Sequence, residues 1–105
     1  MSYNLFIDDE RFPPDDGKDW TIVRTSYDAI LHVAKHGMPR YISFDHDLGG
    51  ADTSMKFIAW LIEAVLDGRV QIPEDFSYYV HSQNPVGAQN IKYKMDALVE
   101  YARGV

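Results

Sequence analysis

The fold of this chain is decided by the stretch at residues 41–68, which reads YISFDHDLGGADTSMKFIAWLIEAVLDG. Residues 41–45 are mostly aromatic and branched and predict a buried strand, and the polar residues after them predict a loop. Over residues 53–67 the apolar side chains recur at helical spacing, and Gly68 ends the pattern. The stretch therefore predicts a strand, a polar loop and a helix that packs back on the strand.

Strand and helix patterns alternate through the rest of the chain. Further strands are predicted over residues 4–8, 20–24 and 77–81. Further helices are predicted to begin at Thr25 and after Asn84, because both residues are typical helix caps. This alternation favours a mainly parallel sheet, and right-handed crossovers predict helices on both of its faces.

Composition excludes several classes of function. The chain has 105 residues, which we interpret as one domain over residues 1–105. It has no cysteine, which excludes a thiol nucleophile and a cysteine zinc site. A formal net charge of -6 argues against non-specific binding to duplex nucleic acid. The sequence shows no signal peptide and no apolar run long enough to cross a bilayer, so we expect a cytoplasmic protein without membrane association.

Polar residues follow three of the four predicted strands. The first strand ends in DDER at residues 8–11, the third in DHD at residues 45–47, and the fourth in HSQN at residues 81–84. Ligands of open parallel sheets bind beyond the carboxyl ends of the strands. The three segments therefore predict a functional site at one edge of the sheet, although loops also carry polar residues without any function.

The acids and imidazoles of these segments suggest two kinds of chemistry. Asp8, Asp9 and Asp45 offer the oxygen ligands that Mg²⁺ or Mn²⁺ prefers; the alternative is that an aspartate such as Asp9 only caps a loop. His46 and His81 are candidates for proton transfer near neutral pH. The alternative for each histidine is a hydrogen-bonded structural role.

The start of the last predicted helix is a candidate phosphate site. Free backbone N–H groups at a helix start attract phosphate, and Gly87 would permit close approach. Arg11 could bind phosphate oxygens with two parallel hydrogen bonds. The alternatives are an ordinary cap for Asn84 and a solvent-exposed ion pair for Arg11.

Three runs of sequence together carry a resemblance to a known family. They are LFIDDER at residues 5–11, ISFDHDLG at 42–49 and HSQNPVGAQN at 81–90. These runs resemble the cyclic-phosphate processing receiver-like domains of bacteria and phages. The resemblance implies a small flavodoxin- or receiver-like three-layer α/β sandwich, with about four mainly parallel strands in the order 2-1-3-4 and three helices. It also implies the processing of cyclic phosphate ends, in part in RNA repair.

Comparison with the parent receiver pattern shows both matches and departures. The acidic pair of a receiver resembles Asp8 and Asp9, its phosphoacceptor resembles Asp45, and its hydroxyl resembles Ser82. A receiver also has a fifth strand that ends in a lysine, followed by a fifth helix. The present sequence ends after the helix near Arg103, so we expect the fifth strand and helix to be missing.

These inferences predict a hydrolase: a metal-assisted phosphodiesterase that opens a cyclic phosphate, with a 2′,3′-cyclic phosphate on a nucleotide or at an RNA end as the expected form. The predicted metal ligands are Asp8, Asp9 and Asp45, holding Mg²⁺ or Mn²⁺. The predicted catalytic residues are His46, His81 and Asp47. The predicted substrate-binding residues are Arg11, Ser82, Asn84, Gly87 and Asn90.

Two alternatives remain open at this point. One is a non-enzymatic module that binds a nucleotide or phosphate as a sensor or sponge. The other is a phosphoacceptor receiver in which Asp45 is phosphorylated, and the missing lysine counts against it. In all three hypotheses the same edge of the sheet carries the function.

Overall fold

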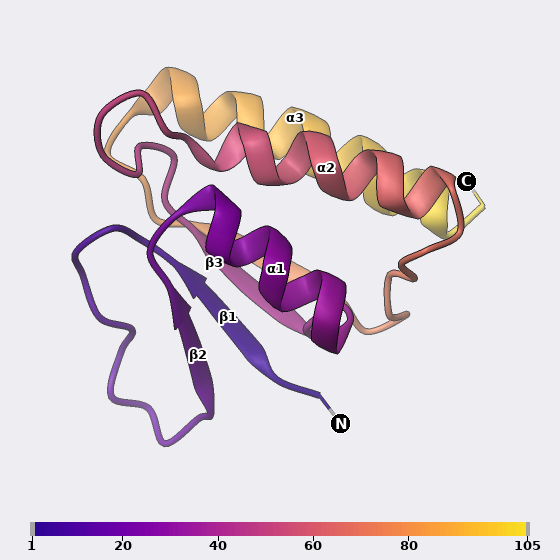
Figure 1. Ribbon diagram of the computed structural model, residues 1–105, viewed down its shortest axis with the longest axis horizontal. Coiled ribbons are helices and arrows are strands. Elements are labelled where there is room, and N and C mark those ends of the chain that lie inside the picture. The colour runs from indigo at the N-terminus through magenta and orange to yellow at the C-terminus, as the bar shows by residue number, and fades with distance from the viewer. Residues whose placement is uncertain (1, 105) are drawn as a thin grey trace.

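Four short parallel strands form the sheet in the computed structural model, which describes residues 2–104. Their order is β2-β1-β3-β4, and every neighbouring pair is parallel (Figure 1). The strands are β1 (Asn4–Ile7), β2 (Trp20–Val23), β3 (Tyr41–Phe44) and β4 (Ser77–Val80). The expected number, direction and order of strands are confirmed. Each strand ends one residue earlier than predicted.

Three helices follow the last three strands. They are α1 (Ser26–His36), α2 (Ser54–Leu66) and α3 (Pro85–Ala102). The Oγ1 atom of Thr25 accepts a hydrogen bond from the N–H of Asp28, and Oδ1 of Asn84 accepts one from the N–H of Gly87, both at 3.0 Å. These caps satisfy N–H groups that have no partner within the helix. The predicted starts of α1 and α3 are therefore confirmed.

All three helices cover the same face of the sheet. Helix α2 packs against α1 on one side and α3 on the other, and Figure 1 shows them as one layer. The crossovers from β2 to β3 and from β3 to β4 step across the sheet in the same direction, so right-handed connections place both of their helices on one face. The connection that steps the other way, from β1 to β2, contains no helix. The prediction of helices on both faces is therefore wrong, and residues 2–104 form two layers.

The core lies between the sheet and the helix layer. Alternate strand residues such as Leu5, Ile42 and Phe44 are fully buried there against Leu61 and Ile91 of the helices. The residues between them point to the opposite face, which we call the open face. This face is formed by Phe6, Trp20, Ile22, Tyr41, Ser43 and Tyr79. The loop after β1 reaches this face through Phe12 and Pro14, and Tyr79 remains 58% exposed.

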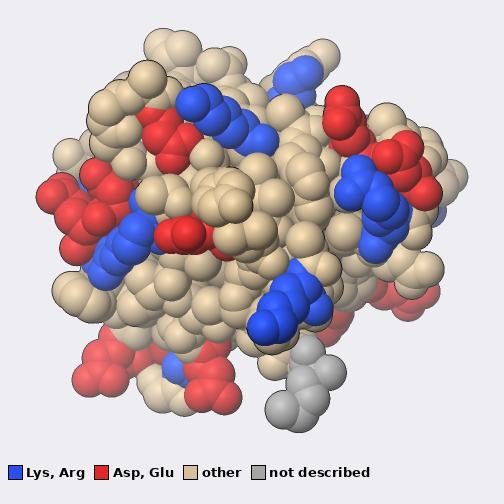
Figure 2. All heavy atoms as spheres, viewed as in Figure 1, with Lys and Arg blue, Asp and Glu red and all other residues tan. Residues whose placement is uncertain are grey.

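No helix within residues 2–104 is both long and apolar enough to cross a membrane. Acidic and basic side chains are interspersed on the face shown in Figure 2. Acidic side chains lie at the left of that view, where Figure 1 shows the loop between β1 and β2, and others lie at the right.

Candidate acidic site at the carboxyl edge of the sheet

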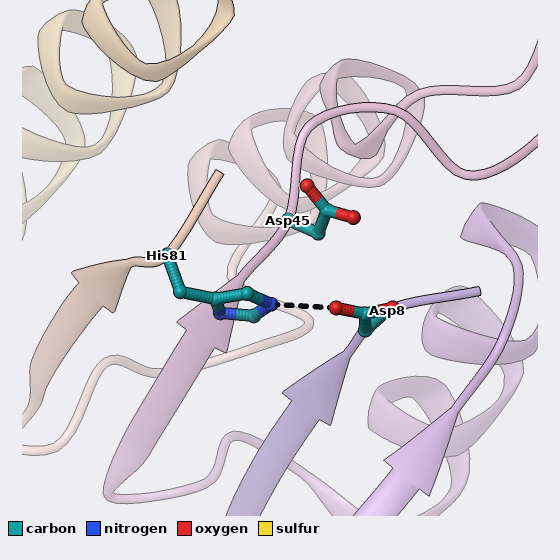
Figure 3. A group of neighbouring side chains, drawn as sticks. All are labelled: Asp8, Asp45 and His81. Atoms are coloured by element: carbon teal, nitrogen blue, oxygen red, sulfur yellow. Dashed lines mark hydrogen bonds and ion pairs between the residues drawn. The ribbon is translucent and has the colours of Figure 1, made fainter. Parts of the chain in front are cut away.

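Three ionisable side chains from distant parts of the chain meet at the carboxyl edge of the sheet. Asp8, Asp45 and His81 are the residues that directly follow β1, β3 and β4 (Figure 3). One ligand atom from each lies within 4.8 Å of the other two. Each residue is two positions beyond an open-face residue, so strand alternation turns all three side chains toward the same side. We call these three residues the acidic triad.

Asp8 is fully buried and accepts several hydrogen bonds. Its Oδ1 accepts from the backbone N–H groups of Glu10 and Arg11, each at 2.9 Å, and its Oδ2 accepts from Nε2 of His81 at 2.9 Å. The guanidinium Nε of Arg11 lies 3.6 Å from Oδ2. Burial alone would raise the pKa of Asp8, but the backbone N–H groups, His81 and the Arg11 charge together lower it. Asp8 is therefore an ionised carboxylate at neutral pH.

The ring of His81 is held at both nitrogens. Nε2 donates to Asp8, and Nδ1 lies 2.7 Å from the hydroxyl oxygen of Ser43. The ring also stacks in parallel on Phe6, with the centroids 4.8 Å apart. In neutral His81 the proton is on Nε2, because the Asp8 carboxylate can only accept, and the Ser43 hydroxyl then donates to Nδ1. Ser43 can instead accept from Nδ1 when the ring is protonated.

Asp45 differs from Asp8 in having one uncommitted oxygen. Its Oδ1 accepts from the N–H of His46 at 2.9 Å, and its other oxygen has no hydrogen-bond partner among the described residues. Burial raises the pKa of Asp45, and the nearby charge of Asp8 raises it further. Two carboxylates crowded in this way are stabilised by a cation between them, so the free oxygen of Asp45 is a natural ligand position.

A cleft opens above the acidic triad, and we call it the acidic cleft. Its volume is about 520 Å³, within the range of ligand pockets. Asp45 is the member of the triad that lines it. The complete lining is Asp9, Glu10, Arg11, Asp45, Asp47, Gly49, Gly50, Ser82, Gln83 and Asn84.

Five further predicted site residues also line the acidic cleft: Asp9, Arg11, Asp47, Ser82 and Asn84. The Oγ of Ser82 accepts from the N–H of Asn84 at 3.1 Å, and Nδ2 of Asn84 lies 3.4 Å from Asp47. The hydrogen bonds from His46 and from Asn84 lower the pKa of Asp47. These residues line the cleft together with Asp45 of the acidic triad, whereas Asp8 and His81 are not part of its lining.

The structure does not bring three other predicted residues into the cleft lining. The ring of His46 lies against the start of α3, where a Cβ added at Gly87 would be 2.4 Å from its Cγ. The N–H of Gly87 is already bound by the Asn84 cap. Asn90 is exposed one turn further along α3. Gly87 therefore permits a close approach to His46, and a role of these residues in binding or catalysis stays a prediction.

Ser43, Phe6 and Arg24 support the site but were not identified from the sequence. Ser43 and Phe6 hold the His81 ring, and Arg24 donates to the backbone carbonyl of Asp8 at 3.0 Å. Ser43 had a detectable signal, since it is a hydroxyl within a buried strand and lies two residues before Asp45. Arg24 had no such signal in the sequence, because its partner is a backbone carbonyl, which every residue carries.

The residues of the acidic triad fit a divalent cation. Carboxylate oxygens suit Mg²⁺ and Mn²⁺, and an imidazole nitrogen in the same group favours the softer Mn²⁺ over Mg²⁺. His81 can join the ligands only if Nε2 gives up its proton, and it could not then donate a proton from that atom. Asp9 lies in the cleft lining but is not part of the close group, so Asp8 and Asp45 are the carboxylate ligands that the geometry favours.

Comparison with known proteins identifies the family. No curated protein and no solved structure matches the chain. The family model described as the cyclic-phosphate processing Receiver domain matches residues 3–97, a range that includes all four strands and the whole acidic triad. The chain therefore belongs to the cyclic-phosphate processing receiver domain family.

Proposed function

We propose that the protein hydrolyses cyclic phosphate esters at the acidic triad, with a divalent cation as cofactor. The observation that carries this proposal is the meeting of Asp8, Asp45 and His81 within 4.8 Å of one another, with Asp45 lining an open cleft. Two carboxylates and an imidazole at one point provide both cation binding and proton transfer. The family membership supports a cyclic phosphate as the substrate class.

The charged residues of the site divide into cation ligands and a phosphate-binding group. Asp8 and Asp45 would hold the cation, which when bound stabilises negative charge on the phosphoryl oxygens and lowers the pKa of water. The side chain of Arg11 is 42% exposed and lies at the cleft, so it can turn toward a phosphate oxygen. Ser82 and Asn84 offer further polar groups at the mouth of the cleft.

His81 is the residue best placed to move a proton. In the reaction, water adds to phosphorus and gives up one proton, one phosphorus–oxygen bond of the ring breaks, and the leaving oxygen takes a proton. We assign the proton on the leaving oxygen to Nε2 of protonated His81, which Asp8 orients, and the proton lost by the attacking water restores the protonated ring. Ser43 holds the other nitrogen in both protonation states. His46 is not part of the acidic triad, and its bond to Asp47 at 3.0 Å suits a positioning role.

One observation favours a second candidate, a module that binds a cyclic phosphate without turning it over. Both ring nitrogens of His81 are engaged by protein groups, and neither His81 nor His46 lines the acidic cleft. An imidazole that is fully hydrogen-bonded serves structure as readily as catalysis. Binding of the phosphate alone would need only the cation, Arg11 and the polar groups of Ser82 and Asn84.

A product analysis separates the two candidates. The purified protein is incubated with 2′,3′-cyclic AMP, 3′,5′-cyclic AMP and an RNA oligonucleotide that ends in a 2′,3′-cyclic phosphate, each with Mg²⁺, Mn²⁺ or EDTA. We expect at least one substrate to gain one water by mass, with Mn²⁺ or Mg²⁺ but not with EDTA. Recovery of every substrate unchanged, together with saturable binding, would establish the binding module instead.

Variants of the acidic triad test the assigned roles. Asp45→Asn should lower kcat/KM about 10²–10³-fold, the scale for removing one charge-stabilising group. His81→Gln should lower kcat about 10²–10⁴-fold, the scale for a proton-transfer group. The matched control is Asp75→Asn, because Asp75 is exposed, pairs with Arg40 and precedes the start of β4 at the opposite edge of the sheet. Equal activity of the wild type and both triad variants would contradict the proposal.

A further inference from the structure

A second hollow lies on the open face of the sheet, next to the acidic triad. We call it the aromatic groove, and its volume is about 510 Å³. Unlike the acidic cleft, it is lined mainly by rings. The lining residues are Phe6, Arg11, Phe12, Pro14, Tyr41, Ser43, Tyr79 and His81.

The aromatic groove and the acidic cleft meet at the same ionisable residues. His81 lines the groove and binds Asp8, and Arg11 lines both hollows. Tyr79 is two residues before His81 on the same face of β4, a spacing of about 6.6 Å along a strand. A small ligand with its charged end at the acidic triad would therefore extend its other end over these rings.

Two aromatic side chains of the groove are open to solvent. Tyr79 is 58% exposed and Phe12 is 75% exposed. Phe12 is nevertheless held in place, because the guanidinium of Arg24 lies 4.9 Å from its ring centroid and also binds the carbonyl of Asp8. The position of an exposed ring is thus coupled to the loop that shapes the acidic site. Rings held in this way next to a polar site are typical of ligand-binding surfaces.

We propose that the aromatic groove binds the base of a nucleotide whose cyclic phosphate lies at the acidic triad. This inference rests on the proposed function and specifies its substrate class as nucleosidic. A base is flat and aromatic, so it stacks on exposed rings such as Tyr79 and Phe12 whatever its identity. The hydroxyls of Tyr41 and Tyr79, which also line the groove, add polar partners. An apolar side chain from a protein partner would leave these hydroxyls, and the neighbouring triad, without a role.

The test compares substrates with and without a base. Hydrolysis of 2′,3′-cyclic AMP and of the base-free methyl riboside 2′,3′-cyclic phosphate is measured for the wild type, Tyr79→Leu and Phe12→Leu. Each variant should raise KM for the cyclic AMP about 5- to 150-fold, the range that corresponds to stacking of one base. KM for the base-free compound should not change. The matched control is Tyr93→Leu, which removes a ring that is 74% exposed on α3, outside the groove lining.

A binding measurement keeps this inference separate from the proposed hydrolysis. Titration with AMP is followed by NMR, reading the backbone amides of Tyr41, Ser43 and Tyr79. We expect these amides to shift in the wild type, with binding weakened at least fivefold in Tyr79→Leu. Equal effects of the ring variants on both cyclic compounds, or equal AMP affinity of wild type and Tyr79→Leu, would overturn the groove assignment. Absence of hydrolysis alone, with selective AMP binding retained, would overturn only the enzymatic part.

Discussion

The two faces of the sheet are built from alternate residues of the same four strands, yet they differ in polarity and in exposure to solvent. The helix-covered face is apolar, and Leu5, Ile42 and Phe44 on it are inaccessible to solvent. The open face carries rings and hydroxyls, and Tyr79 on it is more than half exposed. The helix-covered face therefore buries the larger part of the apolar side chains, and the open face holds the proposed base-binding groove.

The same division continues past the ends of the strands. Asp45 and His46 are consecutive, but Asp45 joins the acidic triad on the open-face side, whereas His46 packs against Gly87 in the helix layer. Polar residues next to each other in the sequence therefore belong to different environments. Alternation, rather than residue type, decides which polar residue at a strand end reaches the site.

The largest expected effect comes from the helix-covered face. Ile42→Ala removes buried methyl groups at a position with no solvent exposure and should lower the free energy of unfolding by about 2–5 kcal/mol. Urea unfolding measures this loss. The folded fraction should keep wild-type KM for a cyclic phosphate, because Ile42 points away from the acidic triad. A loss below about 1 kcal/mol would contradict the view that burial on the helix-covered face stabilises the fold.

A smaller loss is expected where His46 meets the helix layer. In Gly87→Ala the new Cβ would lie 2.4 Å from Cγ of His46, so the ring or the start of α3 must move. Such overpacking costs about 1–3 kcal/mol, although alanine has the better helix propensity. Thermal unfolding should show this cost in the wild-type background and show no cost in His46→Ala. If Gly87→Ala stabilised the protein in the wild-type background, the His46 ring would not lie against Gly87 in solution.

Much of this arrangement could be predicted from the sequence. The cap residues Thr25 and Asn84, the glycine at position 68 and the periodicities fixed the helix starts and ends, and the three polar strand ends indicated one functional edge. The two-layer arrangement was also within reach. With the order 2-1-3-4, both helical crossovers step in the same direction, so both helices must share a face.

The composition of the acidic triad was harder to predict, for a geometrical reason. The sequence offered two aspartates after β1 and two histidines at strand ends, and residue type does not separate them. Alternation counted from the strands favours Asp8 over Asp9 and His81 over His46, but only if the strand geometry continues beyond the last hydrogen-bonded residue. The contact between Asp8 and His81 depends on the residue after β4 reaching across β3 to the residue after β1, which no local pattern encodes.

Ser43→Ala tests the open face of the sheet at the residue next to Ile42, which belongs to the helix-covered face. It removes the hydroxyl that binds Nδ1 of His81 and should cost only about 1 kcal/mol of stability. Its effect on function should be larger, with activity lowered about 10- to 100-fold, because supporting partners of a site histidine contribute on that scale. The measurements are kcat/KM against pH and the ¹⁵N chemical shifts of the His81 ring. Unchanged ring shifts would show that Ser43 does not hold His81 in solution.

The smallest expected effect is a gain in stability when Asp45 becomes Asn. Burial and the charge of Asp8 raise the pKa of Asp45 above its ordinary value of 3.8. A raised pKa in the folded state means that the stabilising contribution of the neutral carboxyl is complete below pH 3.8 and is lost as the pH rises through the folded pKa. Asn stays neutral at every pH, so Asp45→Asn should unfold at a higher urea concentration than the wild type at pH 7 in EDTA. The two midpoints should converge as the pH falls below 3.8.

Added Mn²⁺ should reverse the order of these two proteins at pH 7. The cation binds the folded wild type and raises its unfolding midpoint, whereas the variant has lost a carboxylate ligand. A wild type that is already more stable than Asp45→Asn in EDTA would show that the two carboxylates of the triad do not repel each other. In that case the pair of Asp8 and Asp45 would stabilise the folded protein without a cation, and cation binding would no longer be needed to explain why the two carboxylates lie close together.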